Sequence, residues 1–290
     1  MIKTSNLLVG ESVDLSNEIA LLDAPQTPVT SLLLQMGLTE PADAIKVEWR
    51  EKNLASDDTP ALEGAVAAEY ATTRALKDNY CMILSRQAKV SNTVQSVSIN
   101  GIPNMIQDEV QDRLFEVKRG IEKYIITGTK TAESGSTPRQ MNGLLNQIHL
   151  DNQLTAAVFS PDEFLSTVER VWQSGVMGDY YCLTNSTMKG AINSFANDYI
   201  RFDGSEKLFG ITIQRFQTDF GTVFFVLSSL IPADTIAIGN INYLKLAELR
   251  KASITPLAIT GDFVSAMVAW EGSLKLLNSK AWAKWTKTIQ

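Results

Sequence analysis

The first residues of the chain cannot build a hydrophobic core of their own. Two short apolar stripes lie here, at Leu15, Ile19 and Leu22 and then at Val29, Leu32, Leu33 and Met36. Residues 25–28 contain two prolines and separate the stripes, and Gly37 ends the second one. Proline interrupts a helix, and helices of one or two turns are marginal unless they pack on another surface. We therefore predict that residues 1–43 form an arm that lies on something else.

A long excursion follows the arm. Residues 45–50 alternate apolar and polar side chains, which is typical of a half-buried strand, and residues 80–84 form a second candidate strand. Residues 53–79 lie between them. Loops of this length are unusual in a compact domain and are commonly functional or disordered.

The longest predicted helix runs from Pro103 to Gly128. Its apolar residues recur at spacings of three and four, at Ile106, Val110, Leu114, Val117, Ile121 and Tyr124. Proline is favoured at the first position of a helix, and glycine is favoured just after the last. The sequence therefore predicts one amphipathic helix over this whole stretch.

The second half mixes helices and strands. Ser160 followed by Pro161 and Glu163 predicts a capped helix start. Residues 211–217 and 222–227 flank the turn 219–221 and predict a β-hairpin. With further short strands towards the C-terminus, the predicted fold class is α+β.

Composition excludes several classes of protein. The chain has 290 residues, which corresponds to one large domain or two modest ones, and a net charge of −6. Such acidity disfavours tight, nonspecific nucleic-acid binding. Cys81 and Cys182 lie in apolar runs and are expected to be buried thiols in a reducing compartment. Neither a membrane helix nor a secretory signal is predicted, so we expect synthesis in the cytoplasm.

No motif predicts a cofactor, a metal or a catalytic site. His149 is the only histidine and lies between two apolar residues, which is typical of a structural role. Residues 128–131 lack the upstream glycine of a phosphate-binding loop, and residues 219–221 have no accompanying kinase motifs. Asp57 with Asp58 is too small a set to hold a hard cation. We therefore expect a structural or assembly role and no enzyme activity.

The order of these parts resembles the major capsid (head) proteins of tailed double-stranded DNA bacteriophages, which share the HK-97-like fold. The residues that carry the resemblance are Asp14-Leu15-Ser16, Pro25, Thr27-Pro28, Leu32-Leu33, Gly37, Val47-Glu48-Trp49, Leu54, the helix 103–128, Asn142-Gly143-Leu144, the turn 219–221, and the stretch from Thr260-Gly261-Asp262 to Glu271. Each motif is a few common residues, so their order and spacing carry the resemblance.

The resemblance implies a division of the chain into four parts. Residues 1–43 correspond to the N-terminal arm and residues 44–85 to the extended loop. Residues 86–154 and 241–290 correspond to the peripheral domain with the spine helix 103–128. Residues 155–240 correspond to the axial domain.

The resemblance also implies partners and contacts. Hexamers and pentamers are expected to close into an icosahedral head in the virion, around DNA that the shell touches only weakly. Portal, scaffolding and decoration proteins are the further expected partners, without a membrane. The expected inter-subunit contacts of the arm and loop are Leu15, Ile19, Leu32, Leu33, Trp49, Glu48, Glu51, Asp57 and Asp58.

Charge is distributed unevenly in a way that suits such contacts. Residues 1–69 contain twelve acidic and four basic residues, whereas the stretch from Asn240 to the end contains seven basic and three acidic ones. Opposite charges on adjacent surfaces steer association. We therefore expect the acidic arm and loop to lie against basic residues of a neighbouring subunit.

Two alternatives remain open at this stage. An encapsulin nanocompartment uses the same fold to enclose an enzyme, although its arm and extended loop differ. A hydrolase with an unrecognised carboxylate pair is the alternative from another class. A megadalton particle would separate a shell from an enzyme, and neighbouring portal or cargo genes would separate the two shells.

Overall fold

The computed structural model describes residues 27–54, 60, 62–67, 69–97, 104–199, 202–208 and 211–288. Four of the predicted contact residues, Leu15, Ile19, Asp57 and Asp58, lie outside these ranges. No helix within the described ranges is both long and apolar enough to cross a membrane.

Helices and strands alternate irregularly along the chain. In order, the elements are α1 (Pro28–Gln35), β1 (Thr39–Pro41), β2 (Lys46–Asn53), β3 (Thr73–Tyr80), β4 (Met82–Ser91), α2 (Asn92–Ser96), α3 (Met105–Thr127), α4 (Leu144–Gln147), η2 (Leu150–Asn152), β5 (Gln153–Ala156), α5 (Pro161–Gln173), β6 (Tyr180–Thr184), α6 (Ser186–Tyr199), β7 (Phe202–Leu208), β8 (Ile211–Thr218), β9 (Gly221–Leu227), β10 (Thr235–Gly239), η3 (Ile241–Tyr243), β11 (Leu244–Pro256), β12 (Phe263–Leu276) and β13 (Trp282–Lys287).

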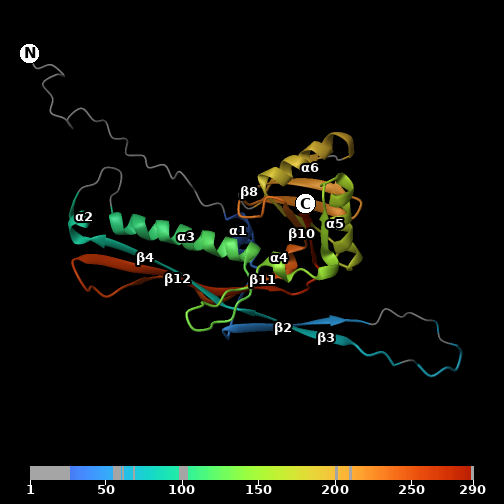
Figure 1. Ribbon diagram of the computed structural model, residues 1–290, viewed down its shortest axis with the longest axis horizontal. Helices are drawn as coiled ribbons and strands as arrows, with labels where there is room; N and C mark the ends of the chain where they lie inside the picture. The colour runs from blue at the N-terminus through green and yellow to red at the C-terminus, as the bar shows by residue number, and fades with distance from the viewer. Residues whose placement is uncertain are drawn as a thin grey trace, which may run out of the picture.

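The helix α3 lies along one face of a four-stranded sheet (Figure 1). The strand order is β1-β11-β12-β4, with β1 parallel to β11 and the other pairs antiparallel. Of the predicted apolar stripe, Val117 and Ile121 are buried, and Val110, Leu114 and Tyr124 are partly buried against the same core. Ile125, which the predicted stripe does not include, is buried as well. The helix ends at Thr127, and Gly128 follows as its C-cap. The predicted long helix is therefore confirmed, with its described start at Met105.

The short helix α1 packs onto α3 through a buried carboxylate. Glu122 has no exposed surface, and it accepts hydrogen bonds from the backbone N–H of Val29 (3.1 Å) and of Thr30 (2.6 Å). These donors lie in the first turn of α1, where the helix itself supplies no acceptor. The Thr30 hydroxyl adds a third bond at 2.7 Å. Glu122 therefore fixes the start of α1 within the same subunit.

This packing corrects part of the prediction for the arm. Leu32 and Leu33 have no exposed surface, and both lie in the main hydrophobic core of the subunit. A side chain that its own subunit covers completely has no surface left for a neighbour. The predicted inter-subunit contacts of Leu32 and Leu33 are therefore wrong, and α1 belongs to the subunit's own fold.

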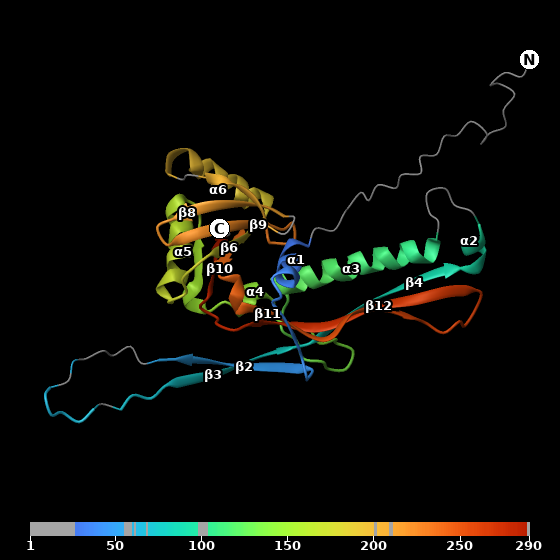
Figure 2. The same ribbon diagram turned by 180° about the vertical axis from the view of Figure 1, so that it is seen from behind.

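A seven-stranded mixed sheet forms the other end of the molecule (Figures 1 and 2). Its strand order is β5-β13-β10-β6-β9-β8-β7. The helix α5 begins with Ser160 as its N-cap and packs against β13 and β10. The predicted turn between β8 and β9 is confirmed at residues 219–220.

The C-terminal strand departs from the predicted domain bounds. The predicted peripheral domain includes residues 241–290 as one piece, but β13 pairs with β10 and β5 in the seven-stranded sheet. Trp282 and Trp285 of β13 are fully buried there. Burial of these two indoles explains why the chain returns to this sheet after β12.

The strands β2 and β3 form a separate hairpin that projects from the body of the subunit (Figures 1 and 2). Their register pairs Lys46 with Tyr80 and Asn53 with Thr73. The predicted extended loop, 44–85, includes the first residues of β4, but β4 starts at Met82 and belongs to the four-stranded sheet. From here on, "the hairpin" denotes residues 46–80 and "the tip" denotes residues 54–72.

Candidate functional site

The hairpin has almost no core of its own. In the described part of the tip, Leu62 and Val66 are 84% and 95% exposed. Along β3, side chains are exposed from Thr73 to Leu76 and become buried only towards Asn79. An isolated two-stranded hairpin is marginally stable in water. The hairpin therefore depends on how its base is attached, and on whatever surface its apolar tip meets.

Asn79 attaches the base of the hairpin to the body. Its side chain is fully buried, and its amide donates hydrogen bonds to the carbonyl oxygens of Leu274 (2.7 Å) and Asn142 (3.1 Å). Its side-chain oxygen accepts from the backbone N–H groups of Asn142 (2.7 Å) and Tyr80 (2.9 Å). One side chain thus joins β3 to β12 and to the loop before α4.

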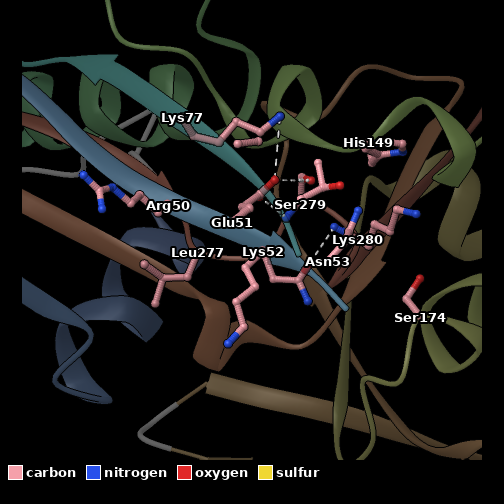
Figure 3. Close-up of a pocket in the computed structure, with 13 residues that line it drawn as sticks. Arg50, Glu51, Lys52, Asn53, Lys77, His149, Ser174, Leu277, Ser279 and Lys280 are labelled. Atoms are coloured by element: carbon pink, nitrogen blue, oxygen red, sulfur yellow. Dashed lines mark hydrogen bonds and ion pairs between the residues drawn. The ribbon is translucent and has the colours of Figure 1, made fainter. Parts of the chain in front are cut away.

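Glu51 attaches the other strand. Its carboxylate accepts hydrogen bonds from the backbone N–H of Ser279 (2.6 Å) and from the Ser279 hydroxyl (3.0 Å). Lys77, diagonally across on β3, lies 3.7 Å from the same carboxylate. Figure 3 shows Glu51 between these two partners. Glu51 therefore has partners within the subunit, and its contact with a neighbour stays a prediction.

Two lysines converge on Asp78 at the base. Lys130, from the loop after α3, lies 2.7 Å from the Asp78 carboxylate, and Lys46 of β2 lies 3.3 Å from it. The Lys130 ammonium holds the pKa of Asp78 below its usual value, against the opposing effect of burial. Asp78 is therefore a charged anchor at neutral pH.

Arg139 holds the segment where the hairpin joins β4. Its Nε donates to the carbonyl oxygen of Cys81 at 2.6 Å, and its guanidinium pairs with the buried carboxylate of Glu271. Glu271 also pairs with Arg250 at 2.6 Å, and Glu133 pairs with Arg139 at 2.7 Å. A buried carboxylate between two guanidinium groups is compensated, which is the condition under which proteins tolerate buried charge.

A pocket of about 390 Å³ lies between the hairpin and the loop before β13. It is lined by Arg50, Glu51, Lys52, Asn53, Thr73, Ala75, Lys77, His149, Ser174, Leu277, Asn278, Ser279 and Lys280 (Figure 3). Four of these side chains are cationic and only Glu51 is anionic. The arrangement suits an anionic group better than a neutral or cationic one.

The other predicted contact residues of the loop lie near the hairpin base. Trp49 is half buried against a small cluster made by Val47, Cys81 and Ala247. Glu48 is exposed and pairs with Lys46 at 2.7 Å. These contacts of Trp49 and Glu48 lie within one subunit, so the contact of both residues with a neighbour stays a prediction.

Several residues that build this region have no signal in the sequence pattern. Asn79, Arg139 and Ser279 act through hydrogen bonds to residues distant in the chain, which leave no periodic signal in a sequence. The cationic pocket was also missed, because Lys280 is far from the hairpin in sequence. The only available signal was the surplus of basic residues near the C-terminus.

The described residues offer neither a metal-binding cluster nor a reactive thiol. No group of three or more His, Cys, Asp or Glu side chains that could hold a metal is present among them. Burial raises the pKa of Cys81 to about 11 and raises that of Cys182 as well, so both thiols are protonated at neutral pH. His149 accepts a hydrogen bond from the backbone N–H of Asp151 as the N-cap of η2.

Comparison with known families gives a match over nearly the whole chain. The sequence model of the family described as SU10 major capsid protein matches residues 3–288. No curated protein matches this chain.

Solved structures with the same architecture come from several kinds of shell. A chain from Mycobacterium phage Bobi matches with a TM-score of 0.66 and 12% identity, covering 100% of both chains. The capsid of a native GTA particle matches with a TM-score of 0.63 and 14% identity, covering 97% of both chains. The SrpI encapsulin of Synechococcus elongatus matches with a TM-score of 0.62 and 15% identity, covering 93% of this chain and 92% of that one.

The two comparisons agree with the geometry described above. At these identities the structural matches show the fold, and the family match shows membership. The fold is HK-97-like, with a projecting hairpin and a long helix along a four-stranded sheet. The chain belongs to the SU10 major capsid protein family, and it is a structural subunit of a homo-oligomeric virion shell.

Proposed function

We propose that this protein assembles as hexamers and pentamers into an icosahedral head that encloses double-stranded DNA. In this proposal, α3 and the four-stranded sheet form the peripheral part of the subunit. The seven-stranded sheet forms the axial part, and the hairpin with residues 1–26 reaches neighbouring subunits. The protein acts by forming contacts and performs no catalysis.

The hairpin is the observation that carries this proposal. It leaves the body of the subunit with exposed apolar residues at its tip, including Leu62 and Val66. Exposed apolar groups of this kind are typical of protein interaction sites. Obligate interfaces bury about 2,000–5,000 Å² and are rich in apolar contacts. A neighbouring copy supplies the surface that the hairpin lacks.

The charge of the chain supports a container for DNA that does not hold it tightly. The net charge is −6, and DNA binding draws its affinity from lysine and arginine that neutralise phosphates. An acidic shell subunit therefore contributes little attraction to packed DNA. Scaffolding, portal and decoration proteins complete the proposed set of partners.

Electron microscopy of the purified protein tests the proposal. The protein is expressed alone and with candidate scaffolding proteins from neighbouring genes, then concentrated and imaged. We expect closed shells, tubes or capsomers. A monomer under every one of these conditions would contradict the proposal.

The contents of particles from infected cells test the second part. We expect particles filled with double-stranded DNA. Absorbance at 260 and 280 nm, before and after nuclease treatment, measures this content. Particles that instead contain a folded enzyme and no DNA would assign the shell to a nanocompartment.

A further inference from the structure

We propose that the cationic pocket beside the hairpin strands receives the acidic hairpin tip of a second copy of this chain. This inference rests on the proposed shell function and names a specific contact within it. The occupant is the tip, residues 54–72, and the receiving groups are Arg50, Lys52, Lys77 and Lys280.

The pocket has free positive charge to offer. Arg50 and Lys52 are exposed residues of β2, and neither forms an ion pair with any described residue. Lys77 lies 3.7 Å from Glu51, and that carboxylate already accepts two hydrogen bonds from Ser279. The one anionic lining residue therefore leaves most of the positive charge of the pocket uncompensated.

Lys280 adds positive charge from the opposite wall. Its ammonium lies 3.4 Å from Asp151, which is 63% exposed and does not line the pocket. Exposed ion pairs of this kind are worth about 0–1 kcal/mol, so a better-placed carboxylate can replace Asp151. The volume of about 390 Å³ falls within the range of about 300–1,000 Å³ that is typical of ligand pockets.

The tip has the complementary charge. Residues 54–72 contain four acidic residues, Asp57, Asp58, Glu63 and Glu69, and no lysine or arginine. Glu63 and Glu69 lie in the described part of the tip and are exposed. The tip therefore has a formal net charge of −4 together with exposed apolar residues such as Leu62 and Val66.

The geometry favours the tip of another copy over the subunit's own tip. The strands of the hairpin line the pocket with residues 50–53 and with Thr73, Ala75 and Lys77. The tip continues beyond these residues, away from the body of the subunit (Figures 1 and 2). A contact from the tip of one copy to the pocket of the next is heterologous, and such contacts generate closed rings or open filaments. Rings of this kind are what capsomers require.

Charge reversal on both sides tests the pairing. We compare the double variant R50E/K52E, the double variant E63K/E69K and the four-fold combination, using light scattering to follow assembly. Each double variant is expected to slow assembly roughly tenfold at low salt, because complementary charge raises association rates by about 10–10³. The combination is expected to restore most of the rate. The differences should shrink at 1 M salt, where the Debye length is about 3 Å.

A matched control separates this pairing from general effects of charge. Arg119 and Lys123 are exposed residues of α3 that do not line the pocket. The variant R119E/K123E makes the same change in net charge as R50E/K52E and is expected to assemble at a rate near that of the wild type. Thermal unfolding of each unassembled subunit shows whether any variant fails to fold.

Disulfide trapping gives a readout that does not depend on rates. The variant E63C/K52C places one thiol on the tip and one at the pocket. The two native cysteines are buried and free, so they contribute little background. Oxidised particles are expected to give a ladder of covalent multimers on a non-reducing gel, and each single-cysteine variant is expected to give none.

The outcomes distinguish the pocket from the shell. If the wild type forms particles but E63C/K52C gives no ladder and the four-fold combination restores no rate, the pocket assignment is overturned and the proposed shell stands. Absence of wild-type particles under all conditions would contradict both the pocket assignment and the proposed shell. Normal assembly of R50E/K52E with reduced retention of DNA would assign the pocket to DNA and overturn the pairing with the tip.

Discussion

Buried polar side chains join elements that are distant in this sequence. Asn79 connects the hairpin to β12, and Glu122 connects α3 to α1 and, through the hydroxyl of Ser228 (3.3 Å), to the segment after β9. Burial raises the pKa of Glu122, and the hydrogen bonds from Thr30 and Val29 oppose that effect. Groups like these are costly to leave without partners, so they specify one arrangement of the parts.

Lys189 gives a prediction with a pH dependence. The side chain lies in the core with its ammonium 3.6 Å from the centre of the Phe225 ring, and burial lowers its pKa to about 8 from 10.5. Between these two values the unfolded chain binds more protons than the folded one, so wild-type stability rises with pH there. The variant K189M lacks this ammonium, so its stability has no pH dependence from this position.

The measurement is urea unfolding of the unassembled subunit at pH 7 and pH 9. We expect the stability of wild type relative to K189M to rise by about 1 kcal/mol between the two values. The variant K287M, at an exposed position, is the control for removal of one lysine. An unchanged gap between wild type and K189M across this range would contradict the buried ammonium.

At the scale of elements, the hairpin is attached to the body by Asn79 at its base and by Glu51 further along β2. The variant N79A removes the acceptor for the N–H groups of Asn142 and Tyr80 and the donor to Leu274. Leaving such groups without partners costs about 1–3 kcal/mol each when they stay buried. We expect N79A to lower the free energy of unfolding by about 2–4 kcal/mol.

Hydrogen exchange locates the effect of N79A. Amides of β2 and β3 are expected to exchange faster in N79A, whereas those of β9 and β10 should change much less. The exposed Asn53, changed to Ala, serves as the control with the same chemistry. Uniform acceleration across the chain, or none in the hairpin, would contradict the anchoring role of Asn79.

The start of α1 divides the N-terminal segment into two parts with different roles. Removing residues 1–26 takes away none of the contacts described here, whereas removing residues 1–37 exposes the core that Leu32 and Leu33 cover. Large-to-small changes at buried leucines cost about 2–5 kcal/mol each, so loss of the whole helix costs more. We expect the shorter truncation to unfold like the full chain and the longer one to be insoluble or unfolded.

Assembly then reports on residues 1–26 directly. With the fold intact, a loss of particles in the shorter truncation supports the proposed contact of this segment with neighbours. Normal particle formation by the same truncation would show that assembly does not need it. Circular dichroism of both truncations provides the test of folding.

Local elements were the part of this fold that could be predicted from sequence. The apolar spacing along α3 and the capping of α5 by Ser160 depend on residues close together in the chain, and both are confirmed. The return of β13 to the seven-stranded sheet depends on the burial of Trp282 and Trp285 against distant strands. Sequence periodicity does not show which strand will be the partner.

The candidate site was harder to predict than the fold. The long excursion between two strand-like runs indicated that the hairpin exists, but not which residues attach it. Leu32 and Leu33 have the same apolar character whether they cover their own core or that of a neighbour. Only the packing against α3 decides between the two, and Glu122 sets that packing through a contact between distant residues.

At the scale of the whole molecule, the subunit is a folded body with a projecting hairpin, and we propose that the tip of this hairpin contacts another copy. The body has its own core, so the claim concerns how copies join and not how one copy folds.

Cryo-electron microscopy of assembled particles tests this claim most directly. The account predicts that, in the reconstructed shell, residues 60–72 of each hairpin contact an adjacent subunit, while α1, α3 and the four-stranded sheet keep the arrangement described here. A shell in which the tips lie free in solvent, with subunits joined only through other surfaces, would contradict the account.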